Sequence, residues 1–102
     1  MKTLENTTTA IPTRENVGGK IEEVIGKIDY KFLIKSCLDN QPQGGFSFSD
    51  FKERDRIEKC LEDDEFAFED EDVKNLKEIV NSMKWASRSP DLTEFLEVVN
   101  NL

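Results

Sequence analysis

The chain contains no histidine and only two cysteines, which removes several classes of chemistry from consideration. Without histidine, neither a Ser-His-Asp nor a Cys-His catalytic arrangement can form, and no histidine-containing zinc site can form either. Cys37 and Cys60 stand 23 positions apart and make no Cys-x-x-Cys pair. We therefore expect a non-enzymatic protein with no catalytic residue, no metal site and no cofactor. Both cysteines are interpreted as small buried side chains in a reduced, cytoplasmic protein.

Long apolar runs are also missing, so the sequence shows neither a signal-peptide core nor a membrane span. The 102 residues suffice for one small domain, and 36% apolar against 35% charged residues predicts a thin core. A formal net charge of −8 repels nucleic-acid phosphates and anionic membranes. We therefore expect a protein partner with a basic surface and no direct binding to nucleic acid or membrane. The composition leaves the oligomeric state open.

The N-terminal segment differs from the rest of the chain. Residues 1–19 contain a threonine triplet, a proline and a glycine pair but few apolar side chains. Such a segment buries too little surface to offset its ordering entropy, so we expect a flexible tail over 1–19 and a single helical domain over 20–102. At the start of that domain, four apolar residues at helical spacing predict a short helix: Ile21, Val24, Ile25 and Ile28.

Capping residues and apolar stripes then predict four main helices. These are expected to begin at Asp29, at Ser47 or Ser49, after Phe68, and at Ser89. The first should end near Asn40, because Pro42 and two glycines follow it. The predicted fold class is therefore mainly α, a small four-helix domain.

A short repeat predicts one addition to this helical fold. The segment GFSFSDF at 45–51 resembles EFAFEDE at 65–71, and each places two phenylalanines in alternation before a helix. Alternation is typical of a strand with one buried face. We therefore consider a short two-stranded β-ribbon in which residues 46–48 pair with residues 66–68.

The most unusual stretch is EDDEFAFEDED at residues 62–72, where eight of eleven positions are carboxylates. It is not an EF-hand loop, because apolar residues occupy its middle and it lacks the required glycine. The acids of 69–72 fit the first turn of a helix, where negative charge is favoured. The acids of 62–65 follow the end of the preceding helix, where negative charge is disfavoured, so helix stability does not explain them.

Two interpretations of this acidic stretch remain open. One is solubility, and the other is a surface that binds a basic partner. The single tryptophan is similarly ambiguous, because it fits either a core lid between two helices or an interface residue. The candidate partner-binding residues are Glu62, Asp63, Asp64, Glu65, Glu69, Asp70, Glu71, Asp72 and Trp85.

Residues 28–100 show a resemblance carried by the order of five segments: Ile28-Asp29-Tyr30, Gln43-Gly44-Gly45, Arg54 to Leu61, Phe68 to Asp72 with Leu76-Lys77, and Trp85. This order resembles small helical proteins of unknown function encoded in bacteriophage and prophage genomes. The resemblance implies a mobile-element origin and transfers no site residues.

Charge and resemblance together suggest two functions. The first is a small acidic binding module, a phage-type inhibitor or regulator that occupies a basic surface of a host nucleic-acid-handling protein. The second is a structural or assembly subunit of a phage particle. The first predicts binding that weakens as salt rises, whereas the second predicts self-association.

Overall fold

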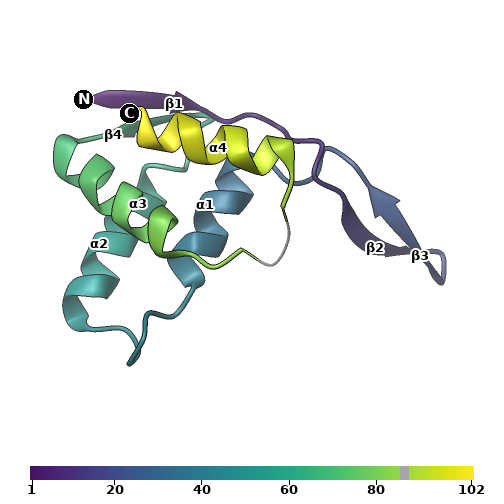
Figure 1. Ribbon diagram of the computed structural model, residues 1–102, viewed down its shortest axis with the longest axis horizontal. Coiled ribbons are helices and arrows are strands. Elements are labelled where there is room, and N and C mark those ends of the chain that lie inside the picture. The colour runs from purple at the N-terminus through teal and green to yellow at the C-terminus, as the bar shows by residue number, and fades with distance from the viewer. Residues whose placement is uncertain (86–87) are drawn as a thin grey trace.

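The computed structural model describes residues 1–85 and 88–102. Over these residues the chain forms four helices and four strands (Figure 1): β1 (Lys2–Glu5), β2 (Thr13–Val17), β3 (Lys20–Val24), α1 (Tyr30–Asp39), α2 (Phe48–Lys59), β4 (Glu65–Phe68), α3 (Asp70–Ser82) and α4 (Pro90–Asn100). The strands pair as two separate antiparallel ribbons, β1 with β4 and β2 with β3. The protein is a small α+β domain, so the mainly α, all-α prediction is wrong.

The helix boundaries follow local signals in the sequence, as predicted. The side chain of Asp29 accepts a 2.8 Å hydrogen bond from the Phe32 amide and caps α1, which has Asn40 as its C-terminal cap. Ser89 caps α4 in the same way, with Pro90 in the first turn. Caps form because the first amides of a helix have no partner within the helix. The predicted helix starts at Asp29 and Ser89 are confirmed.

The ribbon of β1 and β4 lies along one side of the helices, next to α4 (Figure 1). Leu4 is paired with Phe66, and both side chains are buried. The prediction that residues 66–68 form a strand is confirmed, but its predicted partner is wrong. The chain pairs 66–68 with residues 2–4, because Leu4 supplies an inward-facing apolar side chain at the matching position.

Residues 46–48 do not form a strand, because α2 begins within this segment. Ser47 and Asp50 form a reciprocal capping box, with hydrogen bonds of 2.8 and 3.1 Å between side chains and amides. Hydrogen bonding to the Asp50 carboxylate, first by the Ser47 amide and then by the Ser47 side chain, lowers the pKa of Asp50. The second phenylalanine of the repeat, Phe48, is therefore the first residue of α2 and is 74% exposed, whereas its counterpart Phe68 is fully buried.

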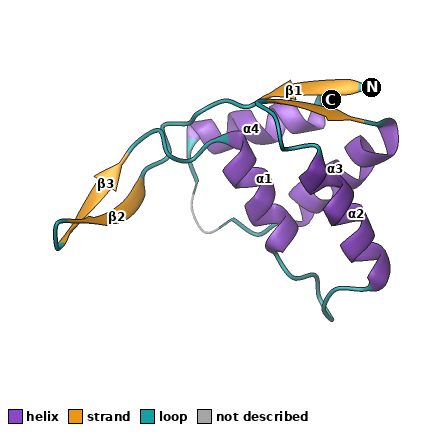
Figure 2. Cartoon of the chain, turned by 180° about the vertical axis from the view of Figure 1, so that it is seen from behind, coloured by secondary structure: helices purple, strands orange, loops and turns teal. Residues whose placement is uncertain are grey.

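The second ribbon is a hairpin that projects from the body as an arm (Figure 2). Its two-residue turn is Gly18-Gly19, and both glycines have positive φ, as the type I′ hairpin turn requires. The predicted short helix at residues 20–27 is wrong, because residues 20–24 form β3. Both β1 and β2 lie within residues 1–19, where the sequence predicts a flexible tail.

The core lies between the β1–β4 ribbon and the helices. It contains five apolar residues of α1 and four of α3, which form the buried faces of these helices. Seventeen residues form this buried cluster: Leu4, Tyr30, Leu33, Ile34, Cys37, Leu38, Ile57, Leu61, Phe66, Phe68, Val73, Leu76, Ile79, Val80, Leu92, Phe95 and Val99. Neither strand of the arm contributes a residue to it.

Candidate functional site

The acids Glu62, Asp63, Asp64 and Glu65 are called here the acidic turn. The first three lie between α2 and β4, Glu65 is the first residue of β4, and all four are exposed. Two contacts hold this segment against the N-terminal strand. The Asn6 amide donates a 2.7 Å hydrogen bond to the Asp64 carbonyl, and Glu65 pairs with Glu5 at the end of the ribbon. The ribbon therefore places a fifth exposed carboxylate, Glu5, beside the acidic turn.

The acidic turn has little compensation from basic side chains. Within residues 1–85 and 88–102, none of its four acids forms an ion pair, and neither does Glu5. Directly opposed like charges, such as Glu5 and Glu65, destabilise a ribbon. Glu62 differs from the others, since it borders a hollow of about 450 Å³ that is also lined by Lys31, Lys35 and Lys59.

The acids at the start of α3 form a second group, and they differ in exposure. Glu69, Asp70 and Glu71 are exposed, whereas Asp72 is only 4% exposed. The guanidinium of Arg56, on α2, lies 3.3 Å from the Asp72 carboxylate and 3.4 Å from that of Glu71. Asp72 therefore joins α2 to α3, and its carboxylate is not available on the surface.

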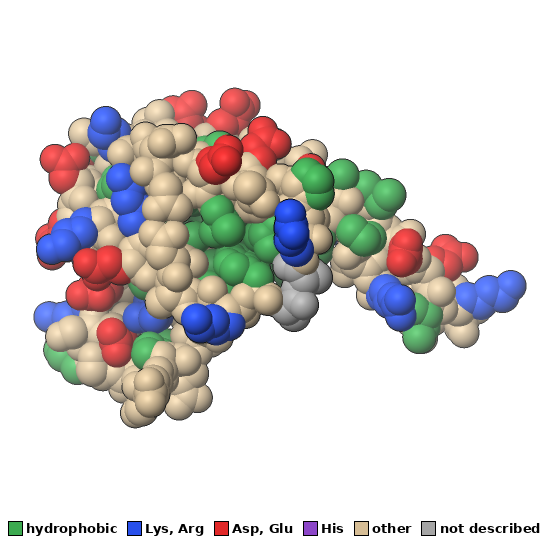
Figure 3. Space-filling model, viewed as in Figure 1, with side chains coloured by type: hydrophobic (Ala, Val, Ile, Leu, Met, Phe, Trp, Pro, Cys, Tyr) green, Lys and Arg blue, Asp and Glu red, His purple; other side chains and the backbone are tan. Residues whose placement is uncertain are grey.

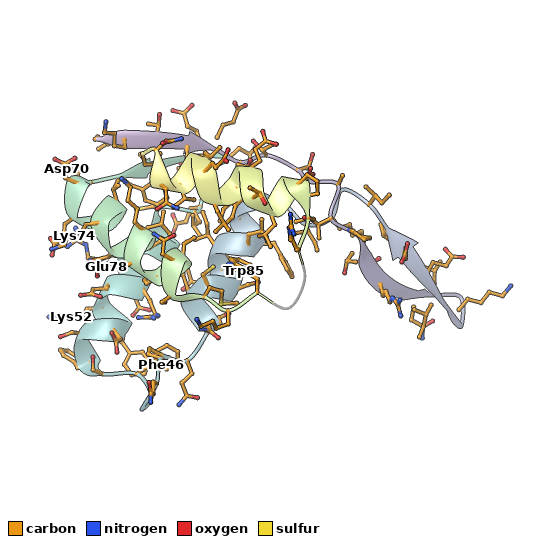
Figure 4. The ribbon with its side chains drawn as sticks, in the orientation of Figure 1. Phe46, Lys52, Asp70, Lys74, Glu78 and Trp85 are labelled. Carbon is orange, nitrogen blue, oxygen red and sulfur yellow. The ribbon has the colours of Figure 1, made fainter. Side chains whose placement is uncertain are left out.

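Trp85 lies apart from both acidic groups. It follows the C-terminal end of α3, whereas Asp70 begins that helix, and Figure 4 shows the two residues at opposite ends. Thirteen helical residues separate these ends by roughly 20 Å. The structure thus brings Glu62–Glu65 together with Glu5 but does not bring Trp85 to them.

Trp85 is half-buried, and its ring packs edge-on against Phe95 with centroids 6.4 Å apart. It also lines an apolar hollow of about 370 Å³, whose wall includes Leu92 and Leu96. Lys84 and Arg88 border the same hollow. Figure 3 shows apolar side chains gathered below α4 with basic side chains beside them. The residue therefore closes the core on one side and lines a surface hollow on the other.

A second group of exposed side chains lies at the start of α2, and the sequence did not single it out. Phe48 and Phe51 are 74% and 52% exposed. The Lys52 ammonium lies 5.0 Å from the centre of the Phe48 ring, which is cation–π distance. Figure 4 shows Lys52 on α2, below Lys74 and Glu78 of α3 in this view. A groove of about 500 Å³ between these helices carries both charge signs.

The thiols of the chain are kept protonated by their surroundings. Burial raises the pKa of Cys37 to about 12. Burial, and then the nearby Asp72 carboxylate, raises the pKa of Cys60. A thiol with a raised pKa is a poor nucleophile and a poor metal ligand, because both roles need the thiolate. Within the described part of the chain, no three Cys, Asp or Glu side chains converge to hold a metal ion.

Comparison with known proteins assigns the chain to no family. No protein-family model, no curated protein and no solved structure matches it. Among the helices in residues 1–85 and 88–102, none has the length and apolar character needed to cross a membrane. The function is therefore inferred from the residues and contacts already described.

Proposed function

We propose that the protein is a non-enzymatic binding module whose acidic turn engages a basic surface of a partner protein. The observation that carries the proposal is the cluster of carboxylates without ion pairs at the end of the β1–β4 ribbon. Five exposed carboxylates from two segments lie there without an ion-pair partner in the described residues: Glu5, Glu62, Asp63, Asp64 and Glu65. In the free chain these carboxylates repel one another. The positive charges of a basic partner would reduce this repulsion and attract the carboxylates, so both effects favour binding.

The partner class follows from charge and from the resemblance to phage-encoded proteins. A basic surface that normally holds nucleic acid presents lysines and arginines spaced for phosphates, and clustered carboxylates compete for the same positions. We therefore propose a phage-type inhibitor or regulator of a host nucleic-acid-handling protein. The proposed setting is the host cytoplasm, since the target works there.

The test is a charge reversal with a matched control. Asp63→Lys, Asp64→Lys and Glu65→Lys together change the net charge from −8 to −2, because each exchange adds two positive charges. The control Asp39→Lys, Asp55→Lys and Glu78→Lys makes the same change at exposed acids outside the acidic turn. Both proteins and the parent chain are used to capture partners from host extract, and affinity is then measured with the purified partner.

We expect the acidic-turn variant to bind at least about tenfold more weakly, because opposed like charges at an interface cost several kcal/mol. The control variant should bind within about threefold of the parent chain. Parent binding should also weaken between about 0.1 M and about 1 M salt, as the Debye length falls from about 10 Å to about 3 Å. Equal binding by all three proteins, or binding unaffected by salt, would refute the proposal.

The alternative function, a structural or assembly subunit of a phage particle, is favoured by different features. The projecting arm and the apolar hollow at Trp85 would serve this role as docking surfaces between subunits. Light scattering distinguishes the two functions. Assemblies larger than a dimer, growing with concentration and stable at high salt, favour the assembly role, whereas a monomer or dimer favours the binding module.

A further inference from the structure

The arm formed by β2 and β3 lacks the support that a two-stranded ribbon needs. Neither strand contributes to the core, and the hairpin stands clear of the helices (Figures 2 and 4). Two of its apolar side chains are largely exposed, Val17 at 50% and Ile21 at 75%, and so is Ile25, the residue after β3, at 69%. An isolated two-stranded ribbon is marginally stable in water, and three or more strands are needed for independent stability. Pairing with further strands would therefore stabilise the arm.

The free edge of β3 has a fixed pattern of outward backbone groups. The hairpin turn has two residues and is flanked by the pair Val17 and Lys20. In such a hairpin the flanking residues direct their backbone polar groups toward each other, and the next residue along each strand directs its N–H and C=O outward. On β3 that residue is Ile21. The edge can thus accept another strand with Ile21 at a hydrogen-bonding position.

The charges along this edge complement those of a second copy of the same edge. If two β3 strands meet antiparallel about a two-fold axis at Ile21, position i of one lies opposite position 42 − i of the other. Lys20 then faces Glu22 of the second copy, and the symmetry makes this ion pair twice. These are non-hydrogen-bonded positions, where opposed side chains lie closest. Ile21 meets Ile21 at the axis, which covers its exposed side chain.

Other antiparallel registers of the arm's edges fit less well. Moving the axis to Glu22 would keep the outward residues Ile21 and Glu23 opposite each other, but it would place Glu22 opposite Glu22 at a non-hydrogen-bonded position, where side chains lie closest. Moving it to Glu23 preserves the hydrogen-bonding pattern but places Glu23 opposite Glu23. On β2, an axis at Arg14 would oppose two arginines, and an axis at Asn16 would form no ion pair. Of these registers, only the Ile21 axis forms two ion pairs between Lys20 and Glu22 and also places the outward N–H and C=O of Ile21 at the centre.

We propose that β3 is a self-association edge that pairs with β3 of a second copy and forms a four-stranded sheet, in the order β2-β3-β3-β2. The pairing is independent of the proposed function, since the arm shares no residue with the acidic turn. Two short strands bury far less than the roughly 1,200 Å² of a standard interface, so we expect a dissociation constant of roughly 0.1–1 mM. The dimer is closed, because the two-fold axis uses the same edge of both copies.

Analytical ultracentrifugation of the full chain over a concentration series tests the proposal. The parent chain should shift from monomer to dimer between about 10 μM and about 1 mM. Ile21→Pro removes the central outward N–H and should leave a monomer at about 1 mM. Arg14→Pro places the same change at an outward position of β2 and should still dimerise. A parent chain that remains monomeric at about 1 mM, or an Ile21→Pro variant that dimerises normally, overturns the proposal.

A charge exchange separates pairing from folding of the arm. Glu22→Lys should weaken the dimer at least about fivefold, since Lys20 would then face a second lysine across the dimer axis. Within one copy the same change strengthens the arm, because position 22 lies opposite Glu15. Adding Lys20→Glu to Glu22→Lys should restore the dimer to within about threefold of the parent. Failure of the double variant to restore dimerisation rules out the Ile21 register. The acidic-turn variant should dimerise like the parent, so the two proposals fail separately.

Discussion

Asn6 connects three segments that are distant in sequence. Its amide donates to the Asp64 carbonyl, its side-chain nitrogen donates to the Asp29 carboxylate at 3.1 Å, and its side-chain oxygen accepts from the Lys31 amide at 3.0 Å. One residue thus fixes the acidic turn relative to β1 and to the start of α1. No pattern in the sequence marks Asn6, because its partners are brought together only by the complete fold.

The Arg56–Asp72 pair yields a prediction in which a second change compensates the first. Arg56→Met leaves a buried carboxylate without its cation and should lower the free energy of unfolding by about 2 kcal/mol. Adding Asp72→Ala removes that stranded charge, so the double variant should be more stable than Arg56→Met alone. Urea unfolding of both single variants and the double variant measures the coupling.

The neighbouring Glu71 supplies the control for this pair. Its side chain is 71% exposed and contacts the same guanidinium, so Glu71→Ala should change stability by less than about 0.5 kcal/mol. If Asp72→Ala and Glu71→Ala have the same small effect, and the double variant is no more stable than Arg56→Met, the burial of Asp72 has no energetic consequence.

Cys37 gives the chain a defined dependence on alkaline pH. Its folded pKa, about 12, lies above the ordinary value of 9.0 that applies in the unfolded chain. Its contribution to stability is fully present below pH 9, because the thiol is protonated in both states there. Above pH 9 the unfolded chain releases a proton that the folded chain keeps, so stability falls as pH rises toward 12. Urea unfolding at several pH values measures this slope.

Cys37→Ala removes the titrating thiol and should give a shallower decline in stability between pH 9 and pH 11 than the parent chain. Every other ionisable group is the same in both proteins, so the difference between the two slopes isolates Cys37. Parallel slopes would contradict the protonated, buried state of this thiol.

The helices were predictable from the sequence, because caps and apolar stripes act over a few residues. Asp29 and Ser89 cap helices through amides three residues away. Strand partners are not encoded at that range. The alternation of β4 was recognisable, but nothing near residue 66 indicates that its partner is Leu4. The arm did carry a signal, since Gly18-Gly19 between two short runs is typical of a hairpin. The helical spacing from Ile21 to Ile28 concealed it.

The β1–β4 ribbon makes the N-terminal strand part of the core, which Leu4→Ala tests. Leu4 is 6% exposed, so its truncation should lower the free energy of unfolding by about 2–4 kcal/mol. Ile25→Ala removes a comparable side chain that is 69% exposed and should cost less than about 0.5 kcal/mol. Thermal and urea unfolding at low protein concentration compare the two variants. Similar small losses for both would mean that β1 contributes nothing to stability.

At the scale of the whole molecule, its surfaces are spatially separated. The acidic turn lies at one end of the β1–β4 ribbon, the apolar hollow lies beyond the C-terminal end of α3, and the arm projects from the body (Figures 1 and 4). Both interpretations of the acids at 62–65, solubility and partner binding, require exposed side chains, and all four are exposed. The sequence could not predict that Glu5 lies beside these acids or that Asp72 is buried. Both features depend on contacts between segments that are distant in the chain.

Because β1 pairs with β4, the ribbon cannot form during synthesis until β4 has been made. Leu4 and Phe66 are 62 positions apart in the chain. At about 5–20 residues per second, a ribosome needs roughly 3–12 s to pass from one to the other. Throughout that interval β1 has no strand to join, while α1 and α2 are already being made. The ribbon that positions the acidic turn must therefore close late, after about two thirds of the chain has been translated.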